Sequence, residues 1–313
     1  MLRVIIHGCG ISVGVIKSLR EREVRKTIGD LKLIGLDSDP LAPGLRLVDS
    51  GLVVPRADSE KFNELPKILR ELGGGILINL VDEALPKLIS MQRDLKRSDV
   101  KFIFPPEKSL KKSMDRKILY EILGEEGVPV PETDRLTPPI AIKRRIGRGG
   151  SGFRVLEEKS HVPEGYIAME YLPGREYGVE MLYSKKGELI SANPREKIDY
   201  RIELGHSVKN VTLRREDLCE IAESAIDAIG GWRGPCSVEM KEDKNGKPKI
   251  TEINPRFTSP IYLITKAGVN LPLMYVMDCL GMKIELEERR NTCKPGVYQT
   301  RYLEEIILPE DQL

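Results

Sequence analysis

Two acidic residues and an asparagine near the end of the chain have the types and spacing of a magnesium site. Glu239 lies in the strand-like run SVEM, and Glu252 and Asn254 lie in the run TEIN. The turn sequence KNGK between these runs is typical of a hairpin, which can bring Glu239 opposite the other two. Glu252 and Asn254 are two residues apart, so they share one face of their strand. Carboxylate and amide oxygens are hard ligands that suit magnesium bound to phosphate.

Arg256 follows Asn254 by two residues and can face the same site. A cation there would stabilise an anionic group during its transfer. The alternative interpretation is a solvated strand face with ordinary charges. An isolated Glu-x-Asn pair would favour that alternative. Two carboxylates on either side of a hairpin turn, followed by the sequence NPRF, favour the metal site.

A glycine-rich segment, IGRGGSG, follows a strand-like run that ends at Lys143. Its glycines would let the backbone approach a triphosphate and donate N–H groups, and Lys143 could neutralise phosphate charge. The alternative is a flexible basic loop, and this segment by itself does not decide between the two.

The segment MEYLPGREYGVEM has the pattern of a nucleotide-binding hinge. An apolar strand leads into Glu170, a tight Pro173–Gly174 turn follows, and Glu176 comes next. The backbone at such a strand end can read the edge of an adenine, and a carboxylate six residues on can hold ribose hydroxyls. The alternative is an interdomain hinge with two surface glutamates.

The elements that must position these residues follow a change of pattern along the chain. Apolar runs at 2–6, 31–37, 76–81 and 101–106, and one near Val53, alternate with helical stretches. This alternation predicts a parallel sheet with helices on both faces. We therefore expect an α/β (α+β) protein with a Rossmann-like domain at 1–106. A second domain at 107–313 would contain a helix at 109–126, a small lid at about 132–172 and an antiparallel, metal-binding core at about 173–313.

Composition narrows the class of protein. The chain has 313 residues, 40% hydrophobic and 31% charged, which is the balance of a soluble globular protein with two or three packed units. Its net charge of +2 gives no reason to expect nucleic acid or an anionic membrane as partner. No apolar run is long enough to span a bilayer, so we expect a cytoplasmic protein. The five scattered cysteines form no CxxC pair, which argues against a zinc site.

The first glycine turn, GCGISVG, imitates a dinucleotide-binding fingerprint, because Asp37 ends the next strand. Its spacing is GxGxxxG, and a glycine pattern alone is weak evidence. We favour a tight strand-to-helix turn that lines an acceptor pocket. We interpret His7 as a core residue.

Taken in order, these motifs make the chain similar to the ATP-grasp superfamily, most closely to its carbamoyl phosphate synthetase-like, carboxylate-amine ligase branch. Residues 114–131 resemble the family's helix that enters the ATP domain, IKRRIGRGGSG its phosphate loop and EYLPGREYGVE its nucleotide hinge. SVEM followed by TEINPRF resembles its metal hairpin, and KAGVNLP is typical of its tail. Each motif is loose alone, but five in family order across nearly the whole chain are specific.

The resemblance implies a role for each matching residue. The residues that would bind the nucleotide are Arg116, Lys143, Gly149, Gly150, Ser151, Glu170, Tyr171, Leu172 and Glu176. The metal ligands would be Glu239, Glu252 and Asn254, with Asn254 and Arg256 as catalytic residues. The candidates on the substrate side are Arg195, His206 and Lys209. Many relatives have lysine where Arg116 stands and glutamine where Glu239 stands, but the charge and the oxygen ligand are kept.

The implied reaction uses ATP and magnesium, or manganese, to activate a carboxylate as an acyl phosphate, which an amine then attacks. The expected partners are small-molecule carboxylate and amine substrates, with neither nucleic acid nor membrane, and a second copy in a homodimer. One alternative is carboxyphosphate or carbamate phosphorylation, as in carbamoyl phosphate synthetases, but 313 residues hold one ATP module. The other is a non-catalytic ATP-binding regulatory protein, against which the intact metal and arginine positions argue.

Overall fold

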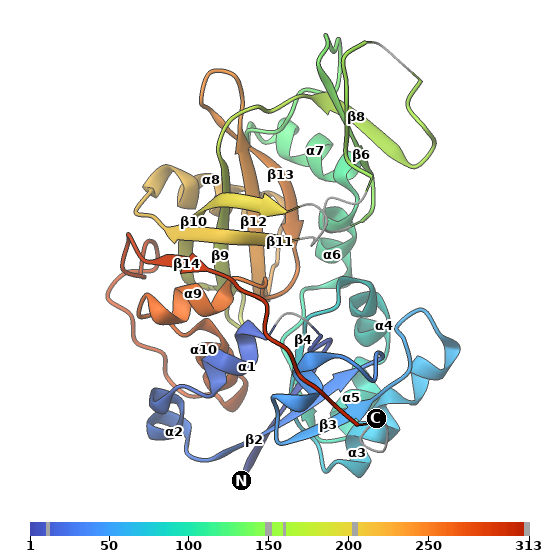
Figure 1. The fold of residues 1–313 in the computed structure, drawn as a ribbon, viewed down its shortest axis with the longest axis vertical. Coiled ribbons are helices and arrows are strands. Elements are labelled where there is room, and N and C mark those ends of the chain that lie inside the picture. Colours follow the sequence, from blue (N-terminus) through green and yellow to red (C-terminus); the bar gives the residue numbers. More distant parts are fainter. Residues whose placement is uncertain (11–12, 148–151, 159–160, 202–205, 310–313) are drawn as a thin grey trace.

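The structure is a computed structural model that describes residues 1–10, 13–147, 152–158, 161–201 and 206–309, without the side chains of 200, 201 and 206. Three sheets follow one another along the longest axis of the molecule (Figure 1). No helix of this described part is both long enough and apolar enough to cross a membrane.

The first sheet is parallel, with the order β3-β2-β1-β4-β5. Its strands are β1 (Leu2–His7), β2 (Leu31–Asp37), β3 (Ser50–Val53), β4 (Gly75–Asn79) and β5 (Val100–Lys101). The connecting helices are α1 (Gly14–Leu19), α2 (Arg22–Ile28), α3 (Leu65–Glu71), α4 (Leu85–Ser90) and α5 (Gln92–Arg97), with the short 3-10 turns η1 (Pro43–Arg46), η2 (Glu60–Glu64) and η3 (Asp82–Ala84). The central strands β1, β2 and β4 are buried almost throughout, as a parallel sheet covered on both faces requires. The predicted Rossmann-like part is therefore confirmed, although its last strand is shorter than expected.

The second and third sheets are antiparallel. The small lid sheet has the order β7-β6-β8 and contains β6 (Ile140–Arg144), β7 (Arg154–Leu156) and β8 (Tyr166–Glu170). The larger sheet has the order β13-β12-β9-β10-β11-β14. Its strands are β9 (Glu176–Tyr183), β10 (Leu189–Arg201), β11 (His206–Thr212), β12 (Gly234–Glu242), β13 (Pro248–Asn254) and β14 (Tyr298–Thr300). We refer to these as the lid sheet and the core sheet.

The single helix predicted at 109–126 is wrong, because two helices occupy this segment. They are α6 (Glu107–Met114) and α7 (Arg116–Glu125), separated by Asp115. Asp115 has an extended backbone, and its carboxylate accepts a hydrogen bond from the N–H of Lys117, so it caps α7 and stops α6. The break places Arg116 at the first turn of a new helix, where its side chain turns toward the core sheet.

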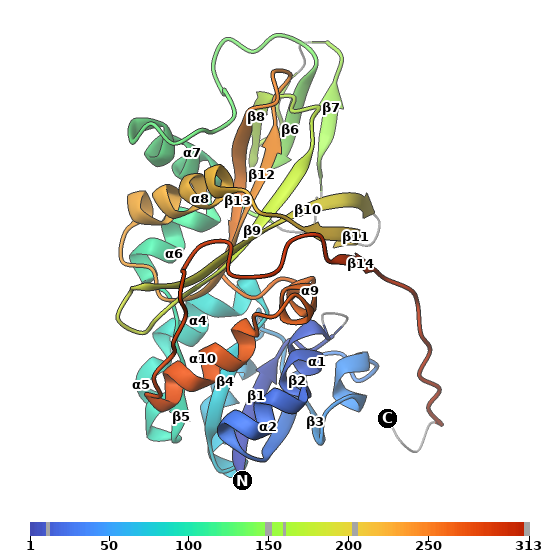
Figure 2. The same ribbon diagram turned by 90° about the vertical axis from the view of Figure 1, so that its left-hand side faces the viewer.

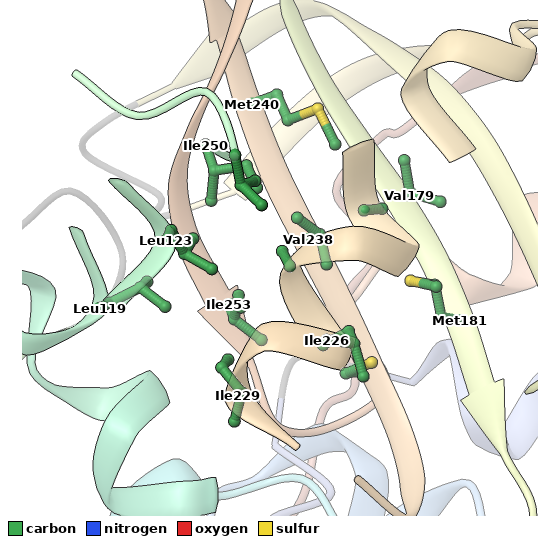
Figure 3. Close-up of a cluster of buried hydrophobic side chains, with 14 of the residues drawn as sticks. Leu119, Leu123, Val179, Met181, Ile226, Ile229, Val238, Met240, Ile250 and Ile253 are labelled. Carbon is green, nitrogen blue, oxygen red and sulfur yellow. The ribbon is translucent and has the colours of Figure 1, made fainter. Parts of the chain in front are cut away.

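One face of the core sheet packs against helices α7 and α8 (Glu216–Ile229). Figure 3 shows Val179 and Met181 of β9, Val238 and Met240 of β12, and Ile226 of α8 in this cluster. Since side chains alternate along a strand, the residues between these apolar ones point to the opposite face. That opposite face carries Glu180 and Glu239, so the apolar alternation of β9 and β12 decides where the charged site lies.

Helices from the end of the chain cover the parallel sheet. Helices α9 (Ile261–Lys266) and α10 (Leu271–Leu280) lie beside α1 and share a hydrophobic cluster with β1 and β4 (Figures 1 and 2). A Cβ at Gly14 would lie 3.0 Å from the Ser259 carbonyl oxygen and 3.0 Å from a methyl group of Ile261. This close approach accounts for a glycine at the end of the first turn.

Candidate active site

The metal hairpin forms as predicted. In the β12–β13 ladder Glu239 lies directly opposite Glu252, and Ser237 lies opposite Asn254. The sequence DKNG forms the turn, where the Asp243 carboxylate accepts hydrogen bonds from the N–H groups of Asn245 and Lys247. Two carboxylates therefore face each other on the charged side of the core sheet.

A buried network of ion pairs surrounds Glu239. The Arg195 guanidinium lies 3.1 Å from one Glu239 oxygen and 2.9 Å from Glu180, and the Lys197 ammonium lies 2.8 Å from the other Glu239 oxygen. Gly178 stands between Glu239 and Arg195 in the strand ladder, and a Cβ there would lie 2.7 Å from the guanidinium. The absence of a side chain at Gly178 is what allows this contact across β9. Burial raises the pKa of Glu239, but Lys197 and Arg195 outweigh that effect and hold it below its usual value.

Arg116 holds the second carboxylate. Its guanidinium lies 2.5 Å from Glu252 and donates hydrogen bonds of 2.8 and 3.0 Å to the carbonyl oxygens of Arg144 and Gly147. Arg116 thus joins the metal hairpin to the end of the lid strand β6. Burial raises the pKa of Glu252, but the charges of Arg116, Lys143 and Lys197 outweigh it and lower the pKa from 4.5 to about 2.

Arg256 reaches back to the parallel-sheet part of the molecule. Its guanidinium makes a two-pronged ion pair with Asp82 of η3, at 2.7 and 3.1 Å, and lies 3.5 Å from the Asn254 amide oxygen. Burial lowers the pKa of Arg256, but the Asp82 carboxylate outweighs it and raises the pKa above its usual value. The arginine is therefore charged and fixed in orientation next to the end of β13.

Two cavities meet at Glu252. The first has about 740 Å³ of empty space, including the part open to solvent, and lies between the lid sheet and the core sheet. Its walls are formed by Ala141, Lys143, Phe153, Met169, Leu172, Glu176, Lys197, Lys241, Thr251 and Glu252. The second has about 480 Å³ of empty space, including the part open to solvent, and is bounded by residues of η3, α6, α7 and the end of β13 and by Ile146 and Gly147, which follow β6.

Some of the residues that were predicted to bind the nucleotide line the first cavity. Leu172, Glu176 and Lys143 line it, whereas Tyr171 packs against the hydrophobic core. The Glu170 carboxylate contacts the Lys249 ammonium and accepts a hydrogen bond from the N–H of Glu132. Glu170 thus links the end of β8 to β13 and to the segment that precedes β6. Glu176 pairs with Lys197 at 2.8 Å. The predicted loop residues Gly149, Gly150 and Ser151 lie outside the described residues.

Lys143 differs from the other cations of this region. Within the described part of the chain, its ammonium has no hydrogen-bond or ion-pair partner. Burial lowers its pKa, against the attraction of Glu252. A partly buried cation without a contacting anion beside a cavity is suited to receive an anionic ligand.

The three substrate-side candidates do not form one group. Arg195 is buried behind Glu239 within the ion-pair network, where it positions that carboxylate. Lys209 is half exposed and lies 3.7 Å from Asp199. The side chain of His206, at the start of β11, lies outside the described residues. Their contacts with substrate stay a prediction.

The donor set fits the chemistry of magnesium, since Glu239, Glu252 and Asn254 offer hard oxygens from adjacent strands. Each of these oxygen donors faces a cation in the structure. Glu239 faces Lys197 and Arg195, Glu252 faces Arg116, and Asn254 faces Arg256. The described residues contain no group of three or more histidines, cysteines or acidic residues arranged for a metal, which agrees with a set that has only two acids.

Sequence reasoning missed three residues that organise the site, namely Asp82, Glu180 and Lys197. Lys197 follows Arg195 by two residues on one strand, so the alternation rule could have placed it on the same face. Glu180 alternates with Val179 and Met181 in the same way. Asp82 carried no such signal, because its partner Arg256 is 174 residues away.

A family model matches the second half of the described fold. The model described as "ATP-grasp in the biosynthetic pathway with Ter operon" matches residues 163–305, which include the hinge, the metal hairpin and the closing segment. The resemblance to the ATP-grasp superfamily is confirmed, and the mixed α/β chain has the ATP-grasp fold.

Particular relatives are distant. The carbamoyl phosphate synthase large chain of Campylobacter jejuni is 23% identical over 74% of this chain and 24% of its own length, and that of Pyrococcus furiosus is 23% identical over 88% and 29%. The chain thus spans about a quarter of the length of these curated relatives. Among solved structures, N5-carboxyaminoimidazole ribonucleotide synthetase from Thermotoga maritima superposes with a TM-score of 0.66 at 21% identity, covering 92% of this chain and 78% of its own. The L-amino acid ligase from Bacillus licheniformis gives 0.68 at 17%, covering 90% and 74%.

Proposed function

We propose that this protein is an ATP- and magnesium-dependent ligase that activates a carboxylate as an acyl phosphate and joins it to an amine. The observation that carries this proposal is the position of Glu252, which lines both cavities and lies opposite Glu239. The cavity between the lid and core sheets would hold ATP, with its phosphates at the Glu252 end. The second cavity would hold the carboxylate beside Arg256.

The residues of this chain have separate tasks in that reaction. Leu172 and the hinge backbone would bind the adenine, Glu176 the ribose, and Lys143, Arg116 and the glycine loop the phosphates. Glu239, Glu252 and Asn254 would hold magnesium, which when bound neutralises phosphate charge and orients the transferred group. Arg256, fixed by Asp82, would stabilise the negative charge on the acyl phosphate and on the tetrahedral species that follows.

The two steps require no side-chain nucleophile. A substrate carboxylate oxygen attacks the γ-phosphorus and ADP leaves, and then the amine nitrogen attacks the acyl carbon and phosphate leaves. The protein contributes positioning and electrostatic stabilisation. Support comes from the names of structurally similar proteins: one is described as a biotin carboxylase–β-γ-ATP complex from Campylobacter jejuni, at 16% identity and a TM-score of 0.71, and another is an L-amino acid ligase.

An ADP-release screen tests the proposal. The full chain is incubated with ATP and magnesium and with pairs of carboxylates and amines, including all amino-acid pairs and bicarbonate with ammonia. Glu252→Gln serves as the blank, and Glu71→Gln, at an exposed position on α3, as the matched control. We expect one pair to release ADP with the control but not with the blank. If ATP binds and no pair releases ADP above the blank, the ligase proposal is wrong. Release with bicarbonate and ammonia alone would favour the carbamoyl phosphate synthetase-like reaction.

A further inference from the structure

Arg301, the residue that directly follows strand β14, is a cation that the proposed reaction does not use. β14 pairs antiparallel with β11 at the edge of the core sheet, and the ladder continues to Arg301, whose N–H bonds the Val208 carbonyl at 2.9 Å (Figure 1). Tyr298 and Tyr302 are exposed, at 73% and 77%, whereas Gln299 and Arg301 between them are partly buried. Alternation therefore places Gln299 and Arg301 together on the inward face.

That inward face continues the charged side of the core sheet. Gln299 accepts a hydrogen bond of 3.0 Å from the Asn210 amide, and the Asn210 oxygen accepts one of 3.3 Å from Arg195. Arg195 in turn holds Glu239. A row of polar side chains thus runs from the metal hairpin to β14, and Arg301 lies at its far end, two residues beyond Gln299.

Among the described residues, Arg301 has no anionic partner. Within the described part of the chain, no side-chain hydrogen bond or ion pair satisfies its guanidinium, and the charge that acts on it is another cation, Arg195. Burial, and then the like charge of Arg195, lower the pKa of Arg301 to about 10. A structural arginine would be expected to have a carboxylate partner, as Arg195, Arg116 and Arg256 have.

We propose that Arg301 binds a non-reacting carboxylate of a substrate, so that the ligase acts on a compound that carries a free carboxylate besides the group that reacts. That the bound carboxylate belongs to a substrate rests on the proposed function, whereas the binding of a carboxylate at Arg301 does not. The reacting carboxylate is assigned to Arg256 on the opposite side of the metal hairpin, which leaves Arg301 for a second anion. An amino acid as the amine, or a dicarboxylate as the acid, has this chemistry.

The test compares free acids with their amides. The probes are the twenty amino acids, small dicarboxylates, and the corresponding carboxamides, each measured with ADP and magnesium by thermal unfolding and, with ATP, by ADP release. The variants are Arg301→Gln, Arg301→Lys and the matched control Arg93→Gln, an exposed position on α5. The thermal unfolding measurement does not depend on turnover. The ADP-release measurement shows whether the amine or the acid substrate must have the additional free carboxylate.

We expect at least one free acid, and not its amide, to raise the Tm of the wild type and the control. For Arg301→Gln the KM of that acid should rise roughly 10- to 100-fold, because a charge-assisted hydrogen bond is lost. The KM for Arg301→Lys should lie between the values of the wild type and Arg301→Gln. The KM of ATP should stay unchanged. The proposal is overturned if no free acid binds better than its amide, or if Arg301→Gln affects acid and amide alike. Arg301-dependent binding without any ADP release would instead refute the ligase activity alone.

Discussion

The carboxylates of the metal hairpin are neutralised by neighbouring cations within the protein itself. Glu252 lies against Arg116, and Glu239 lies between Arg195 and Lys197. Two facing carboxylates would otherwise repel each other and disfavour folding. Under the proposed function Arg116 would also contact phosphate, so this residue would serve both the stability of the fold and the binding of the nucleotide.

Glu252 should make stability depend on pH in a narrow acidic range. Its pKa in the folded protein is below the usual 4.5, at about 2. A carboxylate with a lowered folded pKa stabilises the protein above its unfolded pKa, and this contribution is lost as the pH falls from about 4.5 toward 2. Glu252→Gln should lower the free energy of unfolding by about 3 kcal/mol at most at pH 7.

Urea unfolding of the wild type and Glu252→Gln between pH 7 and pH 3 measures this effect. The difference between the two proteins should be constant down to about pH 5 and shrink below it. Glu71→Gln controls for the general loss of a negative charge. A difference that stays constant to pH 3 would mean that Arg116 does not hold the carboxylate ionised.

Asp82 should act on catalysis through Arg256. Asp82→Asn removes the charge of the two-pronged pair and leaves a buried guanidinium only partly satisfied. We expect a loss of stability on the order of 2 kcal/mol, and a fall of roughly tenfold or more in kcat with little change in the KM of ATP. Asp58→Asn is the control, since Asp58 is an exposed ion-paired residue of the same part of the chain. Equal kcat values for the two variants would rule out a positioning role for Asp82.

At the scale of elements, two devices place the site. Alternation along β9 and β12 directs apolar residues to α8 and charged residues to the opposite face, and the gap at Gly178 lets Arg195 reach Glu239 across a strand. The break between α6 and α7 brings Arg116 to both Glu252 and the end of β6. Arg116 therefore attaches the end of the lid strand β6 to the metal hairpin, in addition to the contact between Glu170 of β8 and Lys249 of β13.

Lys143 on lid strand β6 should affect stability and ATP binding in opposite directions. Lys143→Met removes a partly buried cation without a described partner, so the free energy of unfolding should stay equal or rise by up to about 1 kcal/mol. The Kd of ATP should rise roughly 10- to 100-fold, because a contact to phosphate is lost. Thermal unfolding and calorimetric titration measure the two effects, with the exposed Lys67→Met as control. A destabilised variant with unchanged ATP affinity would mean that Lys143 is a structural residue.

At the scale of the whole molecule, the parallel-sheet part and the core sheet share one hydrophobic cluster, and helices from the end of the chain complete the first part. Tyr275 of α10 makes two hydrogen bonds to the parallel-sheet part at this junction. Its hydroxyl accepts from the N–H of Ile103 at 2.9 Å and donates to the carbonyl of Leu77 at 2.8 Å. We therefore expect the two parts to unfold together rather than one after the other.

Tyr275→Phe tests this coupling. It leaves the Ile103 N–H and the Leu77 carbonyl buried without a partner, which should cost about 1–3 kcal/mol. Thermal unfolding followed by calorimetry and by tryptophan fluorescence should give one transition at a lower Tm for the variant. Tyr302→Phe, at an exposed hydroxyl, should leave the Tm unchanged. Two separate transitions in the wild type would show that the junction does not couple the parts.

The sequence by itself determined the features that depend on neighbouring residues. The parallel strands, the DKNG hairpin that brings Glu239 opposite Glu252, and the hinge before Glu176 follow from local periodicity and turn chemistry. It failed at the helix break, where the capping by Asp115 competed with a continuous helical pattern.

Only the tertiary structure decided which charges meet. The pairs Arg116–Glu252 and Asp82–Arg256 join residues 136 and 174 positions apart, and the position of Arg301 near Arg195 depends on β14 joining the far edge of the core sheet. Hydrophobic periodicity fixes which face a side chain takes, because burial of apolar surface follows the local pattern. Electrostatic partners are chosen by the packing of distant elements, for which a single sequence carries no local signal.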